Sequence, residues 1–366
     1  MKIKIHDIVN ALELLAPLSL QESYDNAGLL VGDKNQICSG ALITLDITET
    51  ILDEAIAKNT NLIISHHPLI FGGLKKITLD TATERIVMKA IKNDIVIYAI
   101  HTNLDNSIEG VNAMICSKLN LVDCKILDSG KKQLRKLVTF CPTAYAEKVR
   151  EALFLAGAGH IGNYDSCSFN AEGIGTFKAL NGANPFVGDI DQLHKEAEIR
   201  IETIFPFYRE KPVLKALFAT HPYEEVAYDI YLLENNNPDT GAGMIGKLPH
   251  PVTETEFLRQ LKETFFTGCI RHSLLTGKKI EKVAVCGGSG SFLSTKALHA
   301  GADVFVTGDI KYHDFFMPEG RILLADIGHY ESEQYTKELL LNHITKIFPT
   351  FAVLISENNT NSIHYF

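Results

Sequence analysis

Hydrophobic residues in the first third of the chain form short continuous runs, separated by segments with helical periodicity. The runs at 40–47, 60–65 and 94–100 predict buried strands, because a strand covered on both faces carries apolar side chains at successive positions. Between them, 48–58 and 82–92 repeat apolar residues every three or four positions, which predicts helices. This alternation predicts an α/β layer in which helices pack on a sheet.

The last third of the chain repeats this pattern. Its apolar runs predict strands at 281–286, 303–307, 321–326 and 351–356, and its periodic segments predict helices at 291–300 and about 329–347. The first residues of the chain add an amphipathic helix, with Ile8, Leu12 and Leu15 on one face. Both ends of the chain therefore have the same α/β character.

The middle of the chain has a different order of elements. It lies between a polar stretch at 128–136 and a Gly/Asn/Pro-rich stretch at 235–246, which we interpret as linkers. Strands are expected at 137–142, 169–178, 197–204 and 225–232, and helices at 144–156 and 209–219. The resulting βαββαβ order is that of a ferredoxin-like, or split-βαβ, α+β domain.

The predicted fold is thus an α/β domain formed by both chain ends and interrupted by an inserted ferredoxin-like domain. The α/β domain is expected at 1–130 and 240–366, and the inserted domain at 137–234. The ends of the α/β domain must then meet in space.

Composition narrows the possible functions. Among 366 residues, 46% are hydrophobic and 22% charged, and the net charge of −9 argues against a general nucleic-acid binder. No stretch approaches the roughly 18 apolar residues of a membrane span, and Asp7 and Glu13 interrupt the N-terminal stretch where a signal peptide would be apolar. The seven cysteines are scattered without a Cys-x-x-Cys pair, which argues against a disulfide framework and favours a reducing cytoplasm.

Three groups of polar side chains follow predicted strands directly. These groups are His66 with His67, His101 with Asp105, and Asp326 with His329 and Glu333. Strand ends open into the crevice of an α/β sheet, where ligands bind. Each group also has an ordinary interpretation, as polar surface, a capping turn or a surface pair on a helix. Their common position at strand ends favours a metal site.

Spacing adds detail to this hypothesis. His329 and Glu333 are four positions apart at the start of a predicted helix, so they lie on one face and can converge. The side chains of the adjacent His66 and His67 diverge, which suits two neighbouring ions better than one. Paired ions about 3.5–4 Å apart are a known hydrolytic arrangement.

Other segments carry weaker signals. The segment "CGGSGS" at 286–291 lies between a strand and a helix, where backbone N–H groups can bind an anion, but a tight turn explains it equally well. The segments "TGDIKYHD" at 307–314 and "YDNAGLLVG" at 24–32 are either loops that line the crevice or ordinary turns. We expect a structural or regulatory role for His221, in the inserted domain.

The motifs "YDNAGLLVG", "SHHPLIF", "HTNLD", "GGSG", "TGDIKYHD" and "GHYESE", in this order, resemble the Ngg-interacting-factor-three-like family. Its bacterial members are labelled GTP cyclohydrolase 1 type 2 homologs. The resemblance covers about residues 24–335. The segment "HPYEEVAYDIY" and the βαββαβ order resemble the PII/CutA-like domain inserted in the longer members.

This resemblance implies a dinuclear metal site with two divalent ions per subunit. Zinc is the first expectation for the metal, and iron, manganese and cobalt are alternatives. The ligands carried over by motif are His66, His67, Asp105, His329 and Glu333. The segment "DNSIEGVN" after Asp105 departs from the family pattern, which leaves the shape of the pocket open. Family members look like toroidal homohexamers whose sites face the interior.

The family label implies hydrolytic opening of the guanine ring of GTP, a small nucleotide ligand, with release of formate. His101 or His313 would then transfer protons, and Gly288, Ser289, Gly290 and Lys311 would hold the triphosphate. Two alternatives stay open, since a fold does not decide a function. One is a metal-dependent phosphohydrolase or nucleotide hydrolase, and the other is a non-catalytic metal-binding ring protein with a regulatory role.

Overall fold

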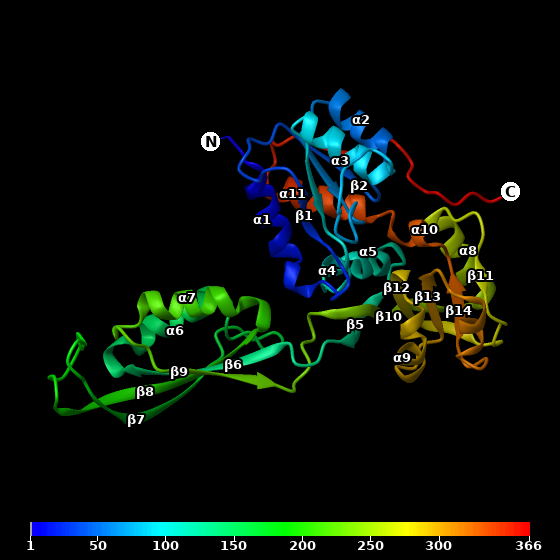
Figure 1. The fold of residues 1–366 in the computed structure, drawn as a ribbon. Coiled ribbons are helices and arrows are strands. Elements are labelled where there is room, and N and C mark those ends of the chain that lie inside the picture. The colour runs from blue at the N-terminus through cyan, green and yellow to red at the C-terminus, as the bar shows by residue number, and fades with distance from the viewer. Residues whose placement is uncertain (1) are drawn as a thin grey trace. The chain divides into compact units, whose positions relative to one another are not determined.

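The computed structural model describes residues 2–366, and the chain divides into two compact units. The first unit combines Met1–Ser129 with Asp239–Phe366, and the second is Gly130–Pro238. Both ends of the chain therefore contribute to one unit (Figure 1). None of the helices in the described part of the chain is long and apolar enough to cross a bilayer.

The first unit contains a five-stranded sheet in which four neighbouring strands are parallel. The strand order is β1 (Gly28–Val31), β4 (Val96–Ala99), β3 (Leu62–Ser65), β2 (Ala41–Thr44) and β15 (Val353–Ile355). Only β1 runs antiparallel to its neighbour. The parallel strands β2, β3 and β4 end at the same edge, which places the residues that follow them close together.

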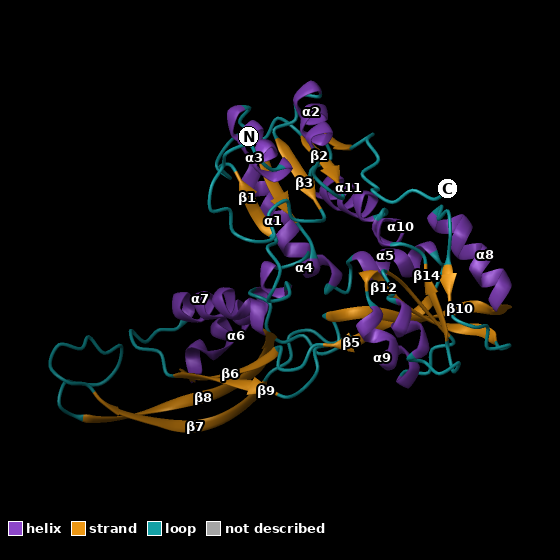
Figure 2. Ribbon diagram, turned by 45° about the vertical axis from the view of Figure 1, so that its right-hand side comes forward, coloured by secondary structure: helices purple, strands orange, loops and turns teal. Residues whose placement is uncertain are grey.

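Helices cover both faces of this sheet, as Figures 1 and 2 show. Leu42 and Ile63 pack toward α2 and α3, whereas the next residues along each strand, Ile43 and Ile64, pack toward α1 and α11. The covering helices are α1 (Ile5–Leu15), α2 (Glu49–Ala57), α3 (Ala82–Lys92) and α11 (Thr336–Ile347). Burial on both faces explains why these strands have continuous apolar sequences.

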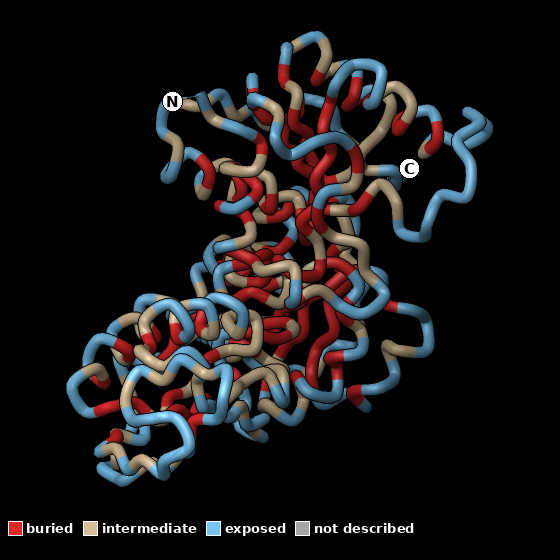
Figure 3. The backbone as a smooth tube through the Cα atoms, turned by 60° about the vertical axis from the view of Figure 1, so that its left-hand side comes forward, coloured by how far each residue is buried: buried red, intermediate tan, exposed pale blue. Residues whose placement is uncertain are grey.

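A six-stranded mixed sheet forms the rest of this unit. Its order is β11 (Arg271–His272), β14 (Leu323–Asp326), β13 (Val304–Gly308), β12 (Lys279–Ser289), β10 (Gly241–Thr253) and β5 (Val122–Ser129). The central strands β12, β13 and β14 are parallel. The helices packed on it are α5 (Val111–Lys118), α8 (Glu254–Phe265) and α9 (Ser294–His299). Figure 3 shows that buried positions concentrate on the strands and on the inner faces of the helices.

Two short helices occur where the sequence predicted something else. The helix expected over 329–347 is interrupted at 334–335, so α10 (His329–Glu333) is separate from α11. The segment "HTNLD" forms α4 (Thr102–Asp105) at the end of β4. These short helices carry side chains of the site described below.

Both boundaries between the units lie in the predicted linkers, but strands occupy part of each linker. Residues 241–246 belong to the long strand β10, and 128–136 contains the end of β5, a turn and the start of β6. A Cβ on Gly241 would lie 2.1 Å from the carbonyl oxygen of Asp128 on the paired strand. This glycine therefore permits close strand approach, whereas its sequence context is typical of a flexible connection.

The second unit has the expected βαββαβ order. Its sheet has the order β7 (Phe169–Lys178), β8 (Leu193–Pro206), β6 (Leu134–Pro142) and β9 (Tyr228–Leu233), and all neighbours are antiparallel. The helices are α6 (Ala146–Leu155) and α7 (Glu210–Thr220). They share one core with the sheet, in which Leu137, Val149, Ile201 and Leu217 are buried. His221 bonds the carbonyl oxygen of Phe140 through Nε2, at 2.9 Å, within this unit.

Candidate metal centre

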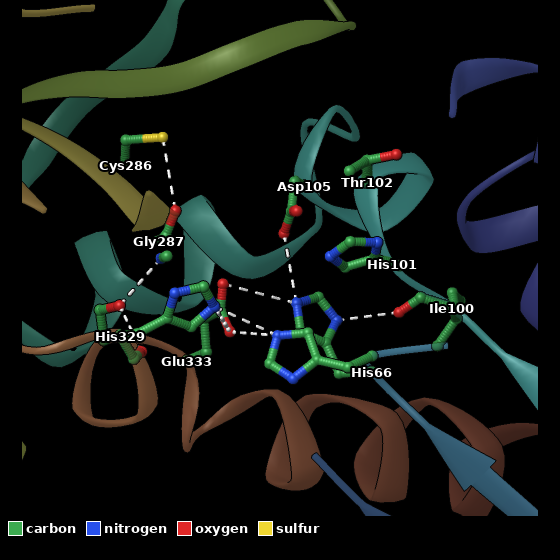
Figure 4. A network of polar contacts seen from close by, with 12 residues as sticks. His66, Ile100, His101, Thr102, Asp105, Cys286, Gly287, His329 and Glu333 are labelled. Carbon is green, nitrogen blue, oxygen red and sulfur yellow. Dashed lines mark hydrogen bonds and ion pairs between the residues drawn. The ribbon is translucent and has the colours of Figure 1, made fainter. Parts of the chain in front are cut away.

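The carboxyl ends of both sets of parallel strands in the first unit meet at one group of histidines and carboxylates. Asp46, His66, His67 and His101 follow β2, β3 and β4, whereas Asp309, His329 and Glu333 follow β13 and β14. Figure 4 shows the side chains of His66, Asp105 and Glu333 pointing toward one another. The five residues that the family resemblance names as ligands all lie in this group.

His66 faces two carboxylates across short gaps. Its Nε2 atom lies 3.7 Å from Asp105 Oδ1 and 3.7 Å from Glu333 Oε1. Its Nδ1 atom lies 2.9 Å from the carbonyl oxygen of Ile100, which can only accept, so Nδ1 carries the hydrogen. The lone pair of Nε2 consequently points at the carboxylates, as a metal ligand would.

The burial of these atoms tests whether a cation fits. Within residues 2–366, neither His66 Nε2 nor Asp105 Oδ1 has a hydrogen-bond partner, although both atoms are buried. Buried polar atoms normally have a partner. A separation of 3.7 Å is too long for a hydrogen bond but suits two ligands that each lie about 2 Å from one ion. The residues therefore fit a divalent cation at this position.

A second group forms around the other oxygen of Glu333. His67 Nε2 lies 3.0 Å and His329 Nε2 lies 3.2 Å from Glu333 Oε2, and the two nitrogens are 3.3 Å apart. The Nδ1 atoms of these rings bond Asp46 at 2.8 Å and Asp309 at 2.7 Å. Because carboxylates accept the Nδ1 hydrogens, both Nε2 atoms are directed toward the centre, which is the usual arrangement of histidines that bind metals.

Glu333 is thus shared by two sets of three potential ligands. One set is His66, Asp105 and Glu333, and the other is His67, His329 and Glu333. The Glu333 side chain is only 3% exposed, so the protein holds a carboxylate away from water between four polar side chains. A buried carboxylate needs compensating positive charge, which ions on its two sides would provide.

Electrostatics within the group favour positive charge. Burial disfavours the charged imidazoles, yet hydrogen bonds to carboxylates raise the pKa of His67 to about 9 and that of His329 to about 11. Burial raises the pKa of Asp105 to about 7. Burial also acts to raise the pKa of Glu333, but attraction to His66 and to His329 holds it well below its usual value. The group therefore attracts cations, whether protons or metal ions.

His101 lies beside both sets. Its ring centroid is 5.3 Å from that of His66 and 5.4 Å from that of His67. Its Nδ1 atom bonds Asp25 Oδ1 at 2.8 Å, while the other oxygen of Asp25 accepts from Thr102. Burial opposes the charge of Asp25, but these bonds lower its pKa to about 2. His101 is therefore held by a carboxylate with a ring nitrogen free to face the centre.

Two of the orienting carboxylates, Asp25 and Asp46, were missed by the sequence reasoning. Asp46 follows strand β2 just as His66 follows β3, so the strand-end rule applied to every strand would have found it. Asp25 stands in "YDNAGLLVG", which we identified only as a possible crevice loop. Asp309, from "TGDIKYHD", takes a similar role, and its left-handed backbone (φ 54°) is one that aspartate tolerates better than most residues.

Some predicted residues lie elsewhere. Asp326 accepts hydrogen bonds from the backbone of Ile310 and Gly328 and pairs with Arg271, so it anchors a loop. His313 is exposed, with its ring 5.2 Å from that of Tyr312, and Lys311 is also exposed. Neither lines the cavity into which the centre opens.

The glycine-rich segment also differs from the prediction. The N–H groups of Gly288 and Gly290 already donate to Ser332 Oγ and Thr307 Oγ1, both at 2.9 Å, so they are not free to bind an anion. Gly288 instead leaves space for the Glu333 carboxylate, because a Cβ at this position would lie 2.3 Å from Glu333 Oε1. Its φ of +60° also favours glycine. Ser289 does line the cavity.

We expect Gly288→Ala to lower metal binding at both sets of ligands, because the new methyl group would displace the Glu333 carboxylate. Equilibrium metal content after dialysis measures the effect. Gly277→Ala is a matched control, since Gly277 has a similar backbone (φ +76°) but open space around a new Cβ. Wild-type metal content in Gly288→Ala would contradict this role of the glycine.

The centre opens into a cavity of about 1000 Å³. The aromatic side chains of Tyr24, Phe71 and Phe292 line it, together with Glu22 and the carboxylates of the centre. No lysine or arginine of the described chain is among the lining residues. The walls therefore carry apolar, acidic and neutral polar side chains, and histidines or bound cations would be the sources of positive charge.

Comparisons with known proteins agree with the order of the motifs. The sequence profile of the family described as Duf34/NIF3 (NGG1p interacting factor 3) matches residues 3–362. A Bacillus subtilis protein named GTP cyclohydrolase 1 type 2 homolog is 40% identical over 362 residues, covering 97% of this chain and 96% of that protein. One of the same name from Halalkalibacterium halodurans is 44% identical over 327 residues, covering 88% and 87%.

Solved structures of related proteins are also similar to this chain. A Bacillus cereus protein related to NIF3 superimposes over the full length of both chains, with a TM-score of 0.87 and 38% identity. A Staphylococcus aureus protein superimposes with a TM-score of 0.78 and 30% identity, over 100% of this chain and 99% of the other. The whole architecture is therefore similar to that of experimentally determined relatives.

Proposed function

Because the chain belongs to the Duf34/NIF3 (NGG1p interacting factor 3) family, we propose that it is a metal-dependent hydrolase that holds two divalent ions around Glu333. The observation that carries this proposal is the sharing of one buried carboxylate by two sets of ligands. His66 and Asp105 would hold one ion with Glu333, and His67 and His329 would hold the other.

Divalent ions in such a pair lower the pKa of water and polarise the bond that is attacked. Zinc, iron, manganese and cobalt all suit imidazole and carboxylate ligands, so elemental analysis of protein purified without a nickel column decides the metal. The protein's own contribution is orientation. Asp46, Asp309 and the carbonyl of Ile100 fix the rings.

His101 is the best candidate for proton transfer to or from a substrate. It lines the cavity, lies beside His66 and His67, and is held by Asp25. An imidazole titrates in the range that proton transfer near neutral pH needs. The exposed position of His313 gives no support for the same role.

The reaction named for the relatives, opening of the guanine ring of GTP, is the first candidate. Phosphoester or nucleotide hydrolysis is the second, and a specific observation favours it. A triphosphate lying away from the ions would meet carboxylates on the cavity wall, and no lysine or arginine of this chain's described residues lines the cavity to balance its charge. A phosphate bound directly at the ions would meet the positive charge that it needs.

We further propose that the second unit is a ferredoxin-like domain of the PII/CutA kind and that the protein assembles as a homohexameric ring. The sheet order β7-β8-β6-β9 and the two helices on one face support the first statement. Family resemblance supports the second. Light scattering tests it, and a monomer would contradict the ring.

The function is tested by adding GTP, and separately p-nitrophenyl phosphate, to protein that has been loaded with two metal ions. We expect either formate from GTP or phosphate from the ester, and we expect the product to disappear in Glu333→Gln. Formate release identifies the ring-opening reaction, and phosphate release identifies the phosphohydrolase. If the metal-loaded protein releases neither product, the hydrolase proposal fails and a metal-binding regulatory protein is the better description.

A further inference from the structure

Residues 356–363, which we call the cover segment, follow β15 without regular secondary structure and lie along the cavity. Thr360, Asn361, Ser362 and Ile363 line the cavity beside the metal ligands. None of the sequence motifs pointed to this segment.

The start of the cover segment is anchored to α2 by one carboxylate. Glu54 accepts hydrogen bonds from Ser356 Oγ at 2.6 Å, the Glu357 N–H at 3.0 Å and Asn358 Nδ2 at 2.7 Å. Lys58 pairs with both Glu54 and Glu357. These bonds fix where the segment leaves the sheet and direct it toward the centre.

The next two hydrogen bonds of the cover segment reach the metal centre from two sides, at Asp46 and at Glu331. Thr360 Oγ1 donates to Asp46 Oδ2 at 2.9 Å, and the other oxygen of Asp46 bonds His67 Nδ1. Asn361 Nδ2 donates to Glu331 Oε1 at 3.0 Å. Glu331 is buried on α10, the short helix that carries both His329 and Glu333.

Thr360 and Asn361 thus connect Asp46, which bonds His67, to the helix that carries Glu333. The hydrogen bond from Thr360 restricts Asp46 to the orientation that directs the Nε2 atom of His67 at the centre. The same residues form part of the cavity wall, so they are placed to contact whatever binds there.

We propose that Thr360 and Asn361 are positioning residues. They connect Asp46, which orients His67, to the helix that carries His329 and Glu333, and they form the substrate-side wall of the site. The metal affinity of the His67 set then depends on the cover segment, through Asp46. This inference rests on the proposed function, since it concerns the same centre.

The test uses full-length Thr360→Val, which keeps the side-chain shape but removes the donor to Asp46. We expect a loss of affinity of up to about 10-fold for one of the two bound zinc ions, since Thr360 acts through Asp46 and removal of a direct partner of a metal ligand costs about 10–100-fold. Competition with a chromophoric chelator measures it. Thr345→Val is the control, because Thr345 bonds only its own helix, through the carbonyl of Leu341, and is exposed.

A double-mutant cycle distinguishes action through Asp46 from a general loss of structure. If Thr360 acts through Asp46, Thr360→Val should weaken binding no further in an Asp46→Ala background, because the acceptor is already gone. Asn361→Ala, which frees Glu331 without touching Asp46, should lower affinity in both backgrounds.

Two results would overturn the inference. One is wild-type zinc affinity in both Thr360→Val and Asn361→Ala, and the other is full additivity of Thr360→Val with Asp46→Ala. Failure of the proposed function gives a different pattern. A wild-type chain that binds no divalent ion refutes the centre itself, whereas a chain that binds zinc but hydrolyses nothing refutes only the reaction.

Discussion

Glu333→Gln is expected to lose both metal ions and to reduce any hydrolytic activity by more than about 100-fold. The carboxylate is 3% exposed and faces His66 with one oxygen and His67 and His329 with the other. The amide is nearly the same size but has no negative charge and only one acceptor oxygen. Direct ligands matter more than their partners, whose removal already costs about 10–100-fold.

Elemental analysis of dialysed protein measures this result, with thermal unfolding to verify the fold. Glu338→Gln serves as the control, because Glu338 pairs with Lys118 near the surface on the next helix and should retain two ions. If Glu333→Gln keeps one ion tightly, Glu333 does not bridge the two sets.

Single substitutions of the adjacent histidines should each remove one ion and leave the other. His66→Ala removes a ligand that faces Asp105 and Glu333 Oε1, and His67→Ala removes one that faces His329 and Glu333 Oε2. The two rings are 4.9 Å apart and tilted by 49°, and they face different oxygens of Glu333 although the residues are neighbours. The double variant should bind neither ion.

Metal content per chain measures this prediction, and His299→Ala, an exposed histidine on α9, should retain the wild-type content. A protein that binds only one ion per chain, lost equally in His66→Ala and His67→Ala, would contradict the two-ion centre. In that case all the ligands would belong to a single site.

The elements of the α/β unit could be predicted from sequence because their physical cause is local. Strands such as β2 and β3 are buried at every position and largely apolar since helices cover both faces, and α3 was predicted with the observed bounds, 82–92. The prediction failed at β10, where Gly241 and Gly243 resemble a linker. Those glycines are explained only by the strands packed beside them.

The residues of the site also fall into those that the sequence could predict and those that it could not. His66, Asp105 and His329 could be identified because polar residues that follow buried strands are recognisable in the sequence. The strand-end rule could have found Asp46 but not its role, and the role of Gly288 was not recognisable, since each role depends on a partner elsewhere in the chain. Gly288 makes room for Glu333, and Asp46 connects His67 to Thr360. Lys311 shows the converse error, because its charge suggested an anion site that its exposed position does not support.

By itself, the sequence determined which chemistry is available: imidazoles and carboxylates at the ends of strands, in an acidic chain with scattered cysteines. The tertiary structure alone decided that His67 and His329, 262 positions apart, lie 3.3 Å from each other and share Glu333. Periodicity reports which face of an element is buried, but it carries no information about which distant element covers that face. The candidate metal centre depends on that packing, because its residues come from two separate sheets.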